Sequence, residues 1–85
     1  AIYGALGSAA GGIGGGLMMK SDRRAKTDIV KVGQLDNGLS VYVFRYKDGG
    51  PFQIGLMADE VVELHPRAVG LIDGVRHVRY ELAVT

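Results

Sequence analysis

The side chains that could do chemistry are concentrated in residues 19–28, MKSDRRAKTD, where the chain changes character. This stretch holds Ser21 and Lys26 five positions apart, with further basic residues around them. A serine hydroxyl is a weak nucleophile until a base takes its proton, and a lysine serves as that base only when its pKa falls towards neutrality. Desolvation or neighbouring positive charge lowers a lysine pKa, and the charge is available here. The stretch therefore contains the parts of a serine–lysine site.

The spacing of Ser21 and Lys26 limits how their side chains can meet. Five positions correspond to a rotation of about 140° around an α-helix, and to opposite faces of a β-strand. Regular structure would therefore hold the two side chains apart. We expect them to meet only through an irregular turn or between two subunits, so that any reaction depends on assembly. The alternative without chemistry is that Ser21 caps a short helical turn over residues 22–26, as serine often does.

The composition limits the kind of protein that carries this stretch. The chain of 85 residues is at most one domain, and residues 21–85 can build only a small core for a free-standing monomer. We therefore expect a partner subunit. The formal net charge of +1 gives no reason to expect a nucleic-acid partner. The chain has no cysteine, which excludes disulfides and thiolate metal sites.

The segment before the cluster, residues 1–20, is rich in Gly and Ala and carries no charge before Lys20. It is long enough to suggest a membrane span, but its many glycines disfavour a helix, so we expect no membrane partner. A signal peptide is also a poor interpretation, and the chain reads as the C-terminal piece of a longer protein. Gly and Ala let backbones approach closely. The segment is interpreted either as a flexible linker or as a packed axis that several chains share.

The remainder of the chain, residues 21–85, is predicted to be a small α+β domain rich in β-hairpins. Residues 27–38 give a short apolar run followed by an Asp-Asn-Gly turn. Residues 39–47 are rich in β-branched and aromatic side chains and predict a strand whose aromatic face belongs to the core. The turn over residues 48–51 leads to residues 52–57, which predict the returning strand.

The last third of the domain is predicted to hold one short helix and a second hairpin. Residues 58–69 have acidic side chains in the first turn and predict a helix of about two turns that Pro66 stops. Two short strands surround Asp73 and Gly74, a pair typical of a two-residue hairpin turn. Residues 80–85 have helical propensity but are too few to form a stable element.

Four pieces of this sequence together resemble one known family. They are SDRRAK at 21–26, FRYK at 44–47, QIGLMADEVVELHP at 53–66 and DGVRHVRY at 73–80. In this order they closely resemble the intramolecular chaperone auto-processing domain of phage tail fibres and tailspikes, the peptidase S74 family. The resemblance covers residues 21 to about 82. It implies a domain that trimerises, nucleates the folding of the fibre upstream and, in many members, then cuts itself off by a serine–lysine mechanism.

The resemblance also implies roles for individual residues. The family's nucleophile falls on Ser21 and its general base on Lys26. Asp22 and Arg24 match the other fixed positions of the motif and would orient the dyad or the scissile carbonyl. The simplest cut is at Lys20–Ser21, where Ser21 attacks its own preceding carbonyl, and the bond between Ser21 and Asp22 is the alternative.

A second set of positions matches the strand–helix motif of the family and is interpreted as structural. This set consists of Gln53, Gly55, Glu60, Val61 and Pro66.

The sequence departs from the family's pattern in two places. Asp59 stands where members usually carry Gln, and the sequence ends at Thr85 where members usually continue into a long helix that forms a trimeric coiled coil. We therefore expect trimerisation to rest on the β-rich core and on residues 1–20. The missing helix also favours a structural use of the domain over an enzymatic one.

Two functions follow as hypotheses. In the first, residues 21–85 form a C-terminal trimerisation and chaperone-type domain of a phage tail fibre or related appendage, retained in the virion as a structural module. In the second, the domain is an active self-cleaving endopeptidase that releases itself near Lys20 and Ser21. The expected partners are two further copies of the chain, other tail proteins and the host surface. The expected location is the virion, with the host cytoplasm during assembly.

No cofactor or metal ion is expected in either case. His65 and His77 are far apart in the sequence, and neither has a second ligand at metal-binding spacing.

Overall fold

The alternating β-branched and aromatic residues in the first half of the domain form a three-stranded antiparallel sheet in this computed structural model, which describes residues 18–85. Its strands are β2 (Lys26–Gln34), β3 (Ser40–Tyr46) and β4 (Gln53–Gly55), in the order β2-β3-β4. The strand predicted over residues 39–47 is confirmed as β3. The returning strand β4 is shorter than predicted and pairs with only three residues of β3.

The turn between β2 and β3 is held by its own side chains. Gly38 takes a positive φ of 95°, as the Asp-Asn-Gly turn predicts. The Asn37 side chain accepts a hydrogen bond from the backbone N–H of Leu39 at 3.1 Å and donates one to the carbonyl of Ala83 at 2.8 Å. The turn therefore also anchors the C-terminal end of the domain.

A second three-stranded antiparallel sheet contains β1 (Met18–Lys20), β5 (Val69–Ile72) and β6 (Val75–Arg79), in the order β1-β6-β5. The predicted hairpin between β5 and β6 is confirmed, and its turn residues Asp73 and Gly74 have φ values of 52° and 76°. The three residues just before Ser21 form β1, which pairs with β6 so that Lys20 lies opposite His77. The sheet thus begins upstream of residue 21, while the predictions for residues 1–17 lie outside the described part of the chain.

Two short helices complete the fold. The predicted helix is confirmed as α2 (Ala58–Leu64), which ends before Pro66, and Pro66–Ala68 form the 3-10 turn η2. A further turn of helix, α3 (Tyr80–Ala83), forms where the sequence predicted no stable element. This turn is too short to be stable alone, but Tyr80 and Ala83 are buried in the core, so tertiary packing stabilises it. None of the helices within residues 18–85 is long and apolar enough to cross a membrane.

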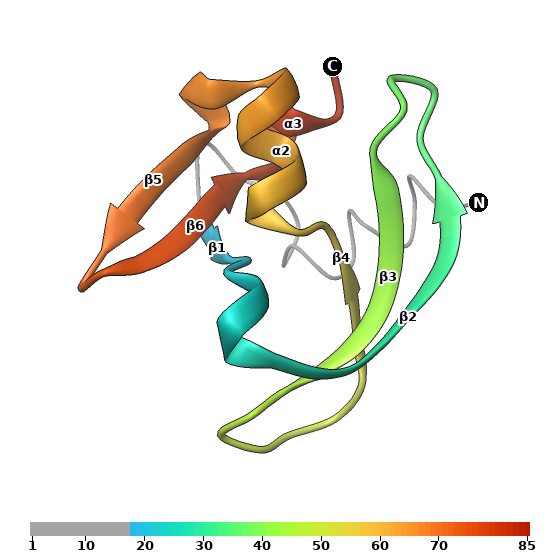
Figure 1. Cartoon of the computed structure of the whole chain (residues 1–85), viewed down its shortest axis with the longest axis vertical. Coiled ribbons are helices and arrows are strands. Elements are labelled where there is room, and N and C mark those ends of the chain that lie inside the picture. The colour runs from blue at the N-terminus through green and yellow to red at the C-terminus, as the bar shows by residue number, and fades with distance from the viewer. Residues whose placement is uncertain (1–17) are drawn as a thin grey trace.

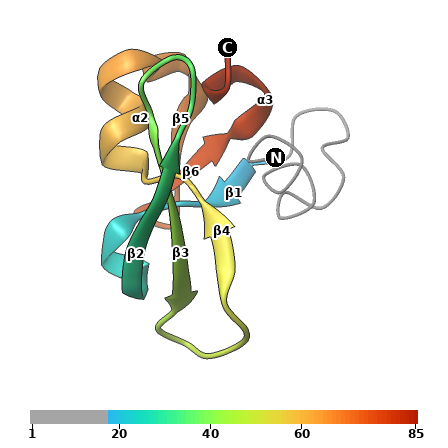
Figure 2. The same cartoon turned by 90° about the vertical axis from the view of Figure 1, so that its right-hand side faces the viewer.

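The hydrophobic core is shared by both sheets and α2. Figure 1 shows α2 between the β5–β6 hairpin and the long β2–β3 hairpin, and Figure 2 shows β4 beside β3 with β1 and α3 on the side away from α2. Ten buried side chains make up the core: Leu35, Leu39, Val41, Leu56, Ala58, Val61, Ala68, Val78, Tyr80 and Ala83. Because both sheets contribute to this one core, the segment that connects β1 to β2 is fixed at both of its ends.

Gly55, at the end of β4, leaves the space that Tyr80 occupies. A Cβ atom at this position would collide with the hydroxyl oxygen of Tyr80 and would lie 3.2 Å from the ring of Phe44. We therefore expect Gly55→Ala to lower the free energy of unfolding by about 1–3 kcal/mol, as overpacked core positions do. Urea denaturation measures this change.

Gly70→Ala is the matched control for this variant. A Cβ atom at Gly70 would meet only the end of the flexible Met18 side chain, which can move away. The account of Gly55 is wrong if the two alanine variants lose the same free energy of unfolding.

Candidate functional site

The chain between β1 and β2 makes one irregular turn, which contains the predicted site residues. The 3-10 turn η1 (Arg23–Ala25) begins at Asp22, whose carboxylate accepts a hydrogen bond from the backbone N–H of Arg24 at 3.0 Å. Asp22 therefore caps the turn, and the alternative in which Ser21 is the cap is wrong. Ser21 and Lys26 lie at the two ends of the turn, and both are buried, with 0% and 3% of their surface exposed.

Ser21 is held by its backbone between two elements. Its N–H donates a hydrogen bond to the carbonyl of Arg76 in β6 at 3.0 Å, and its carbonyl accepts one from the N–H of Ala58, at the start of α2, at 2.9 Å. Its hydroxyl oxygen lies 3.4 Å from the hydroxyl oxygen of Tyr80. The potential nucleophile therefore has a fixed position inside the protein.

The Lys26 amine lies in the core and carries the strongest sign of chemistry. Its Nζ donates a hydrogen bond to the carbonyl of Leu56 at 2.8 Å and sits 3.8 Å from the centroid of the Phe44 ring. Burial, assisted by the positive charge of Arg23, lowers the pKa of Lys26 to about 7. The sequence showed only the neighbouring charge, and burial, the other expected cause of a lowered lysine pKa, is the larger one. A large fraction of this amine is therefore neutral at pH 7 and able to accept a proton.

The lowered pKa makes the domain less stable at low pH than at high pH. Between about pH 7 and the usual lysine pKa of 10.5, the unfolded chain binds a proton at Lys26 that the folded chain does not. Stability from this group therefore rises across that window and reaches its full value above it. Groups with strongly shifted pKa values cluster at functional sites, so Lys26 is a candidate for a chemical role.

Ser21 and Lys26 approach the same backbone segment from two directions. Leu56 accepts from Lys26 through its carbonyl, and its N–H donates to the Tyr80 hydroxyl at 3.0 Å. Tyr80 in turn contacts Ser21. Burial raises the pKa of Tyr80, so its hydroxyl keeps its proton at neutral pH. A series of polar contacts through Tyr80 and Leu56 thus links the Ser21 hydroxyl to the Lys26 amine within a single chain.

Asp22 and Arg24 fasten the turn to the second sheet. The Asp22 carboxylate accepts two hydrogen bonds from the Arg24 guanidinium, at 2.9 and 2.7 Å, and one from the backbone N–H of Arg76 at 3.1 Å. The paired guanidinium holds the pKa of Asp22 well below its usual range despite burial of the carboxyl group. Arg24 is 76% exposed and also donates to the carbonyl of Gly74. Both residues therefore position the turn against the β5–β6 hairpin.

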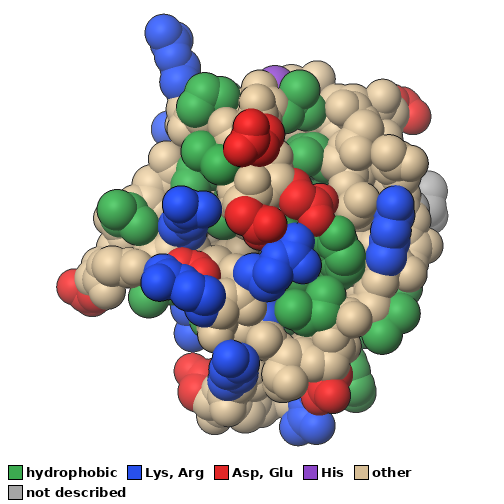
Figure 3. Space-filling view, in the orientation of Figure 1, with side chains coloured by type: hydrophobic (Ala, Val, Ile, Leu, Met, Phe, Trp, Pro, Cys, Tyr) green, Lys and Arg blue, Asp and Glu red, His purple; other side chains and the backbone are tan. Residues whose placement is uncertain are grey.

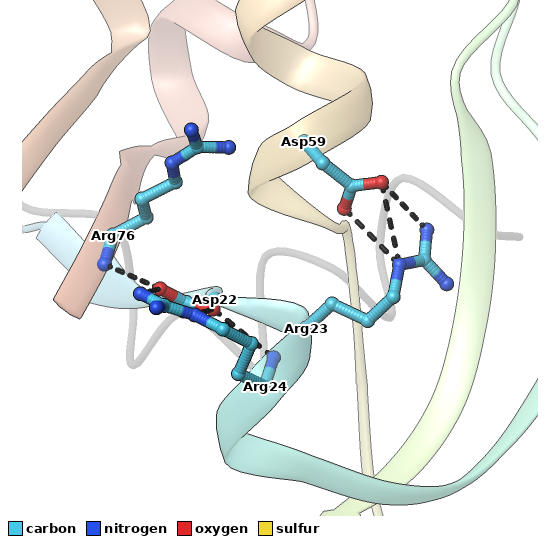
Figure 4. Close-up of a pocket in the computed structure, with 5 residues that line it drawn as sticks. All are labelled: Asp22, Arg23, Arg24, Asp59 and Arg76. Atoms are coloured by element: carbon cyan, nitrogen blue, oxygen red, sulfur yellow. Dashed lines mark hydrogen bonds and ion pairs between the residues drawn. The ribbon is translucent and has the colours of Figure 1, made fainter.

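Arg23 fastens the same turn to α2. Its guanidinium pairs with Asp59 at 3.2 Å and with Glu60 at 2.9 Å, and Glu60 also accepts a hydrogen bond from Tyr42. Asp22, Arg23, Arg24, Asp59 and Arg76 line a shallow pocket of about 430 Å³ at this junction, as Figure 4 shows. In Figure 3 basic and acidic side chains lie side by side in the middle of this face. The ion pairs of Arg23 thus connect η1 to α2 at the protein surface.

A comparison with known protein families matches residues 21–70, more than half of the chain, to the Peptidase S74 family, described as the chaperone of endosialidase. The chain belongs to the Peptidase S74 family. The match begins at Ser21 and includes Lys26, so the site described above lies inside it. No curated protein and no solved structure was found to match the chain. The resemblance seen in the sequence is confirmed, and the domain is a chaperone-type domain of this family.

The strand–helix motif of the S74 domain lies around the site. Gln53 and Gly55 are in β4, Glu60 and the fully buried Val61 are in α2, and Pro66 begins η2. Gly55 and Glu60 affect the site indirectly. Gly55 leaves space for the Tyr80 side chain, and Glu60 forms an ion pair with Arg23. Asp59, which departs from the family's usual Gln, supplies a second carboxylate for the same arginine.

Two tyrosines of the S74 domain contact the candidate site and were missed as site residues in the sequence. Tyr80 contacts the Ser21 hydroxyl, and Tyr46 donates a hydrogen bond to the carbonyl of Lys20 at 2.6 Å. Spacing gave no reason to single them out, since Tyr46 fits a core strand and Tyr80 precedes a segment with no predicted element. The available signal was that both lie inside pieces that carry the family resemblance, FRYK and DGVRHVRY.

The described part of the S74 domain shows no metal centre. Within residues 18–85, no group of three or more His, Asp or Glu side chains is arranged to hold a metal ion.

Proposed function

We propose that this chain is a trimeric chaperone-type domain at the end of a phage tail fibre or related appendage protein, and that it cuts its own backbone between Lys20 and Ser21. The observation that carries the proposal is the burial of the Lys26 amine, with a pKa of about 7, one irregular turn away from the buried hydroxyl of Ser21. Serine is activated by such a neutral amine in serine–lysine hydrolysis. An apolar side chain could fill the same space in the core without the cost of burying an amine.

The ring that forms on attack decides between the two candidate bonds. The Ser21 hydroxyl reaches the carbonyl carbon of Lys20 through a five-membered ring, whereas attack on its own carbonyl would close a strained four-membered ring. Cleavage within one chain therefore favours the bond between Lys20 and Ser21. The Lys20 carbonyl is also held in place by Tyr46, and the N–H of the same peptide by the Arg76 carbonyl.

The reaction proceeds through an ester and consumes one water molecule. The Lys26 amine takes the proton from the Ser21 hydroxyl as the oxygen attacks the Lys20 carbonyl carbon. The C–N bond then breaks, and the Ser21 nitrogen takes the proton from Lys26, which leaves an ester between Lys20 and the Ser21 oxygen. Water hydrolyses this ester to a Lys20 carboxylate and a free serine with an amino terminus. The bond to the Leu56 carbonyl orients Lys26 without occupying the nitrogen lone pair.

Retention of the domain after the cut is supported by β1. The residues just before the bond pair with β6, and Met19 packs against the core. After cleavage the upstream chain would stay attached through this strand. The self-cleaving and the structural hypotheses are therefore compatible in this chain.

We expect the purified 85-residue chain to yield two fragments, residues 1–20 and 21–85, in mass spectrometry under denaturing conditions. The cleavage rate should rise with pH and level off above a midpoint near 7, because only the neutral Lys26 amine accepts the proton. Under native conditions the two fragments should elute together.

Two substitutions control this experiment. Ser21→Ala removes the nucleophile, and Lys26→Arg keeps the positive charge but cannot lose its proton at these pH values. Both should abolish the cut. A fragment boundary elsewhere, an intact wild-type chain, or cleavage that persists in Lys26→Arg would contradict the proposed reaction.

Trimer formation is supported by apolar side chains left on the edge strands. Val30 on β2 is 59% exposed and Leu71 on β5 is 70% exposed, and each lies beside another exposed apolar residue of its own strand, namely Val32 and Ile72. Edge strands of this kind tend to pair or pack with further chains. The small core of residues 21–85 gives a physical reason for such association.

We expect light scattering on the uncut Ser21→Ala chain to give the mass of a trimer. Val30→Lys should reduce this mass to that of a monomer because it places charge on the contact surface. Lys31→Glu, on the next residue of the same strand, is the control and should leave the trimer intact. A stable monomer of the parent chain would contradict the proposed assembly.

A further inference from the structure

We propose that the Tyr46 hydroxyl is a catalytic donor that stabilises the oxyanion formed on the Lys20 carbonyl, and that it thereby directs the cut to the Lys20–Ser21 bond. This inference rests on the proposed self-cleavage and deepens it. It assigns an oxyanion donor to a reaction for which the sequence offered a nucleophile, a base and two supporting residues, Asp22 and Arg24. Tyr46 also comes from a strand that the sequence interpretation treated as core.

The Lys20–Ser21 peptide is held at both of its polar atoms by different sheets. The Tyr46 hydroxyl, on β3, donates to the Lys20 carbonyl oxygen at 2.6 Å. The Ser21 N–H donates to the Arg76 carbonyl, on β6, at 3.0 Å. A short hydrogen bond from a hydroxyl is a strong one, and it is made to the oxygen on which charge would develop. The peptide is therefore positioned and polarised before any reaction.

Strand register places the donor and the base on one face of the sheet. Lys26, the first residue of β2, is paired directly with Tyr46 in β3. Side chains that lie directly opposite each other in an antiparallel pair share a face, and the Lys26 Nζ is 6.0 Å from the centroid of the Tyr46 ring. The same pairing thus places the proposed base and the donor to the Lys20 carbonyl on one face of the sheet.

The Tyr46 ring is fixed by its neighbours, and its hydroxyl carries a proton at neutral pH. Its edge packs against Phe44, with ring centroids 5.2 Å apart, and the Lys20 ammonium lies 4.7 Å from its centroid. Burial, together with the nearby Tyr80 and Asp48, raises the pKa of Tyr46 to about 12. A hydroxyl that stays protonated is the form required of a donor. It also keeps its own proton throughout the reaction, so it takes no part in the proton balance.

The donor distinguishes the two carbonyls that flank Ser21. As the Ser21 oxygen adds to the Lys20 carbonyl carbon, the C=O bond becomes single and its oxygen becomes negative next to the Tyr46 hydroxyl. When the C–N bond breaks, the carbonyl re-forms and the charge disappears. The carbonyl of Ser21 itself receives only a backbone N–H, from Ala58. The Tyr46 hydroxyl therefore favours cleavage of the Lys20–Ser21 bond over the Ser21–Asp22 bond, as ring size also does.

Tyr46→Phe tests the role of the hydroxyl in the full 85-residue chain. We expect this variant to slow cleavage by about 10²- to 10³-fold, the usual effect of removing one oxyanion donor, with the pH midpoint unchanged. Tyr42→Phe is the matched control. It removes a hydroxyl from the same strand, where the partner is Glu60, and should leave the rate within a few fold. Equal rates for Tyr46→Phe and the wild type would overturn the inference.

A second measurement detects the hydrogen bond without relying on cleavage. In the Ser21→Ala background, Lys20 and residue 21 form the only Lys-Ala pair of the chain, so a carbon-13 lysine and nitrogen-15 alanine label reports this one carbonyl. We expect its resonance to move upfield in Tyr46→Phe and to stay in place in Tyr42→Phe. Urea unfolding of the same uncut variants shows whether each is folded.

The outcomes separate this inference from the proposed function. A wild-type chain that is never cut overturns the proposed function and the role of Tyr46 with it. A wild-type chain that is cut, together with an unshifted Lys20 carbonyl in folded Tyr46→Phe, overturns the inference and leaves the proposed function standing. Slower cleavage combined with the upfield shift supports both.

Discussion

The burial of one amine, that of Lys26, is the constraint on which the site depends. Placing a lysine nitrogen against the Phe44 ring and the Leu56 carbonyl costs stability, because the charged form loses its hydration. The protein retains it by fixing the turn before it at several points. Asp22 ties this turn to β6, and Arg23 ties it to α2. These two contacts fix the turn in the conformation in which the amine is buried.

The position of the Lys20–Ser21 peptide would link the proposed cleavage to the completion of folding. Its N–H belongs to one sheet through the Arg76 carbonyl, and its C=O belongs to the other through Tyr46. Neither sheet alone can present this peptide to Lys26. The reaction should therefore wait until both sheets have closed on their common core. The two-sheet arrangement would therefore allow a chaperone-type domain to cut its chain only after it has folded.

Local sequence patterns were sufficient for β3, for the β5–β6 hairpin and for the end of α2, and they singled out Ser21 and Lys26 as candidates. Strong β propensity predicted β3, and the Asp73–Gly74 pair predicted the second hairpin. Pro66 predicted where α2 ends. The spacing argument also required an irregular turn or a second subunit for Ser21 and Lys26 to meet, and η1 between them is an irregular turn. These features depend on local periodicity and turn chemistry, which a single sequence displays directly.

Long-range features were not accessible in the same way. Tyr80 reaches Ser21 only because α3 packs into the core, and Tyr46 reaches Lys20 only because β1 adds to the second sheet. The cause of the lowered Lys26 pKa is likewise tertiary, since burial outweighs the neighbouring charge that the sequence revealed. Such contacts join residues that no local pattern connects, so they emerge only from the folded chain.

The most direct test of this account is a titration of Lys26 itself. Nuclear magnetic resonance of the uncut Ser21→Ala chain, with carbon-13 at the lysine ε position and Lys26→Arg to assign the signal, follows the protonation of this amine. The account predicts a midpoint near pH 7. A midpoint close to the usual lysine value of 10.5 would contradict it, because the amine would then be charged at neutral pH and unable to act as the base.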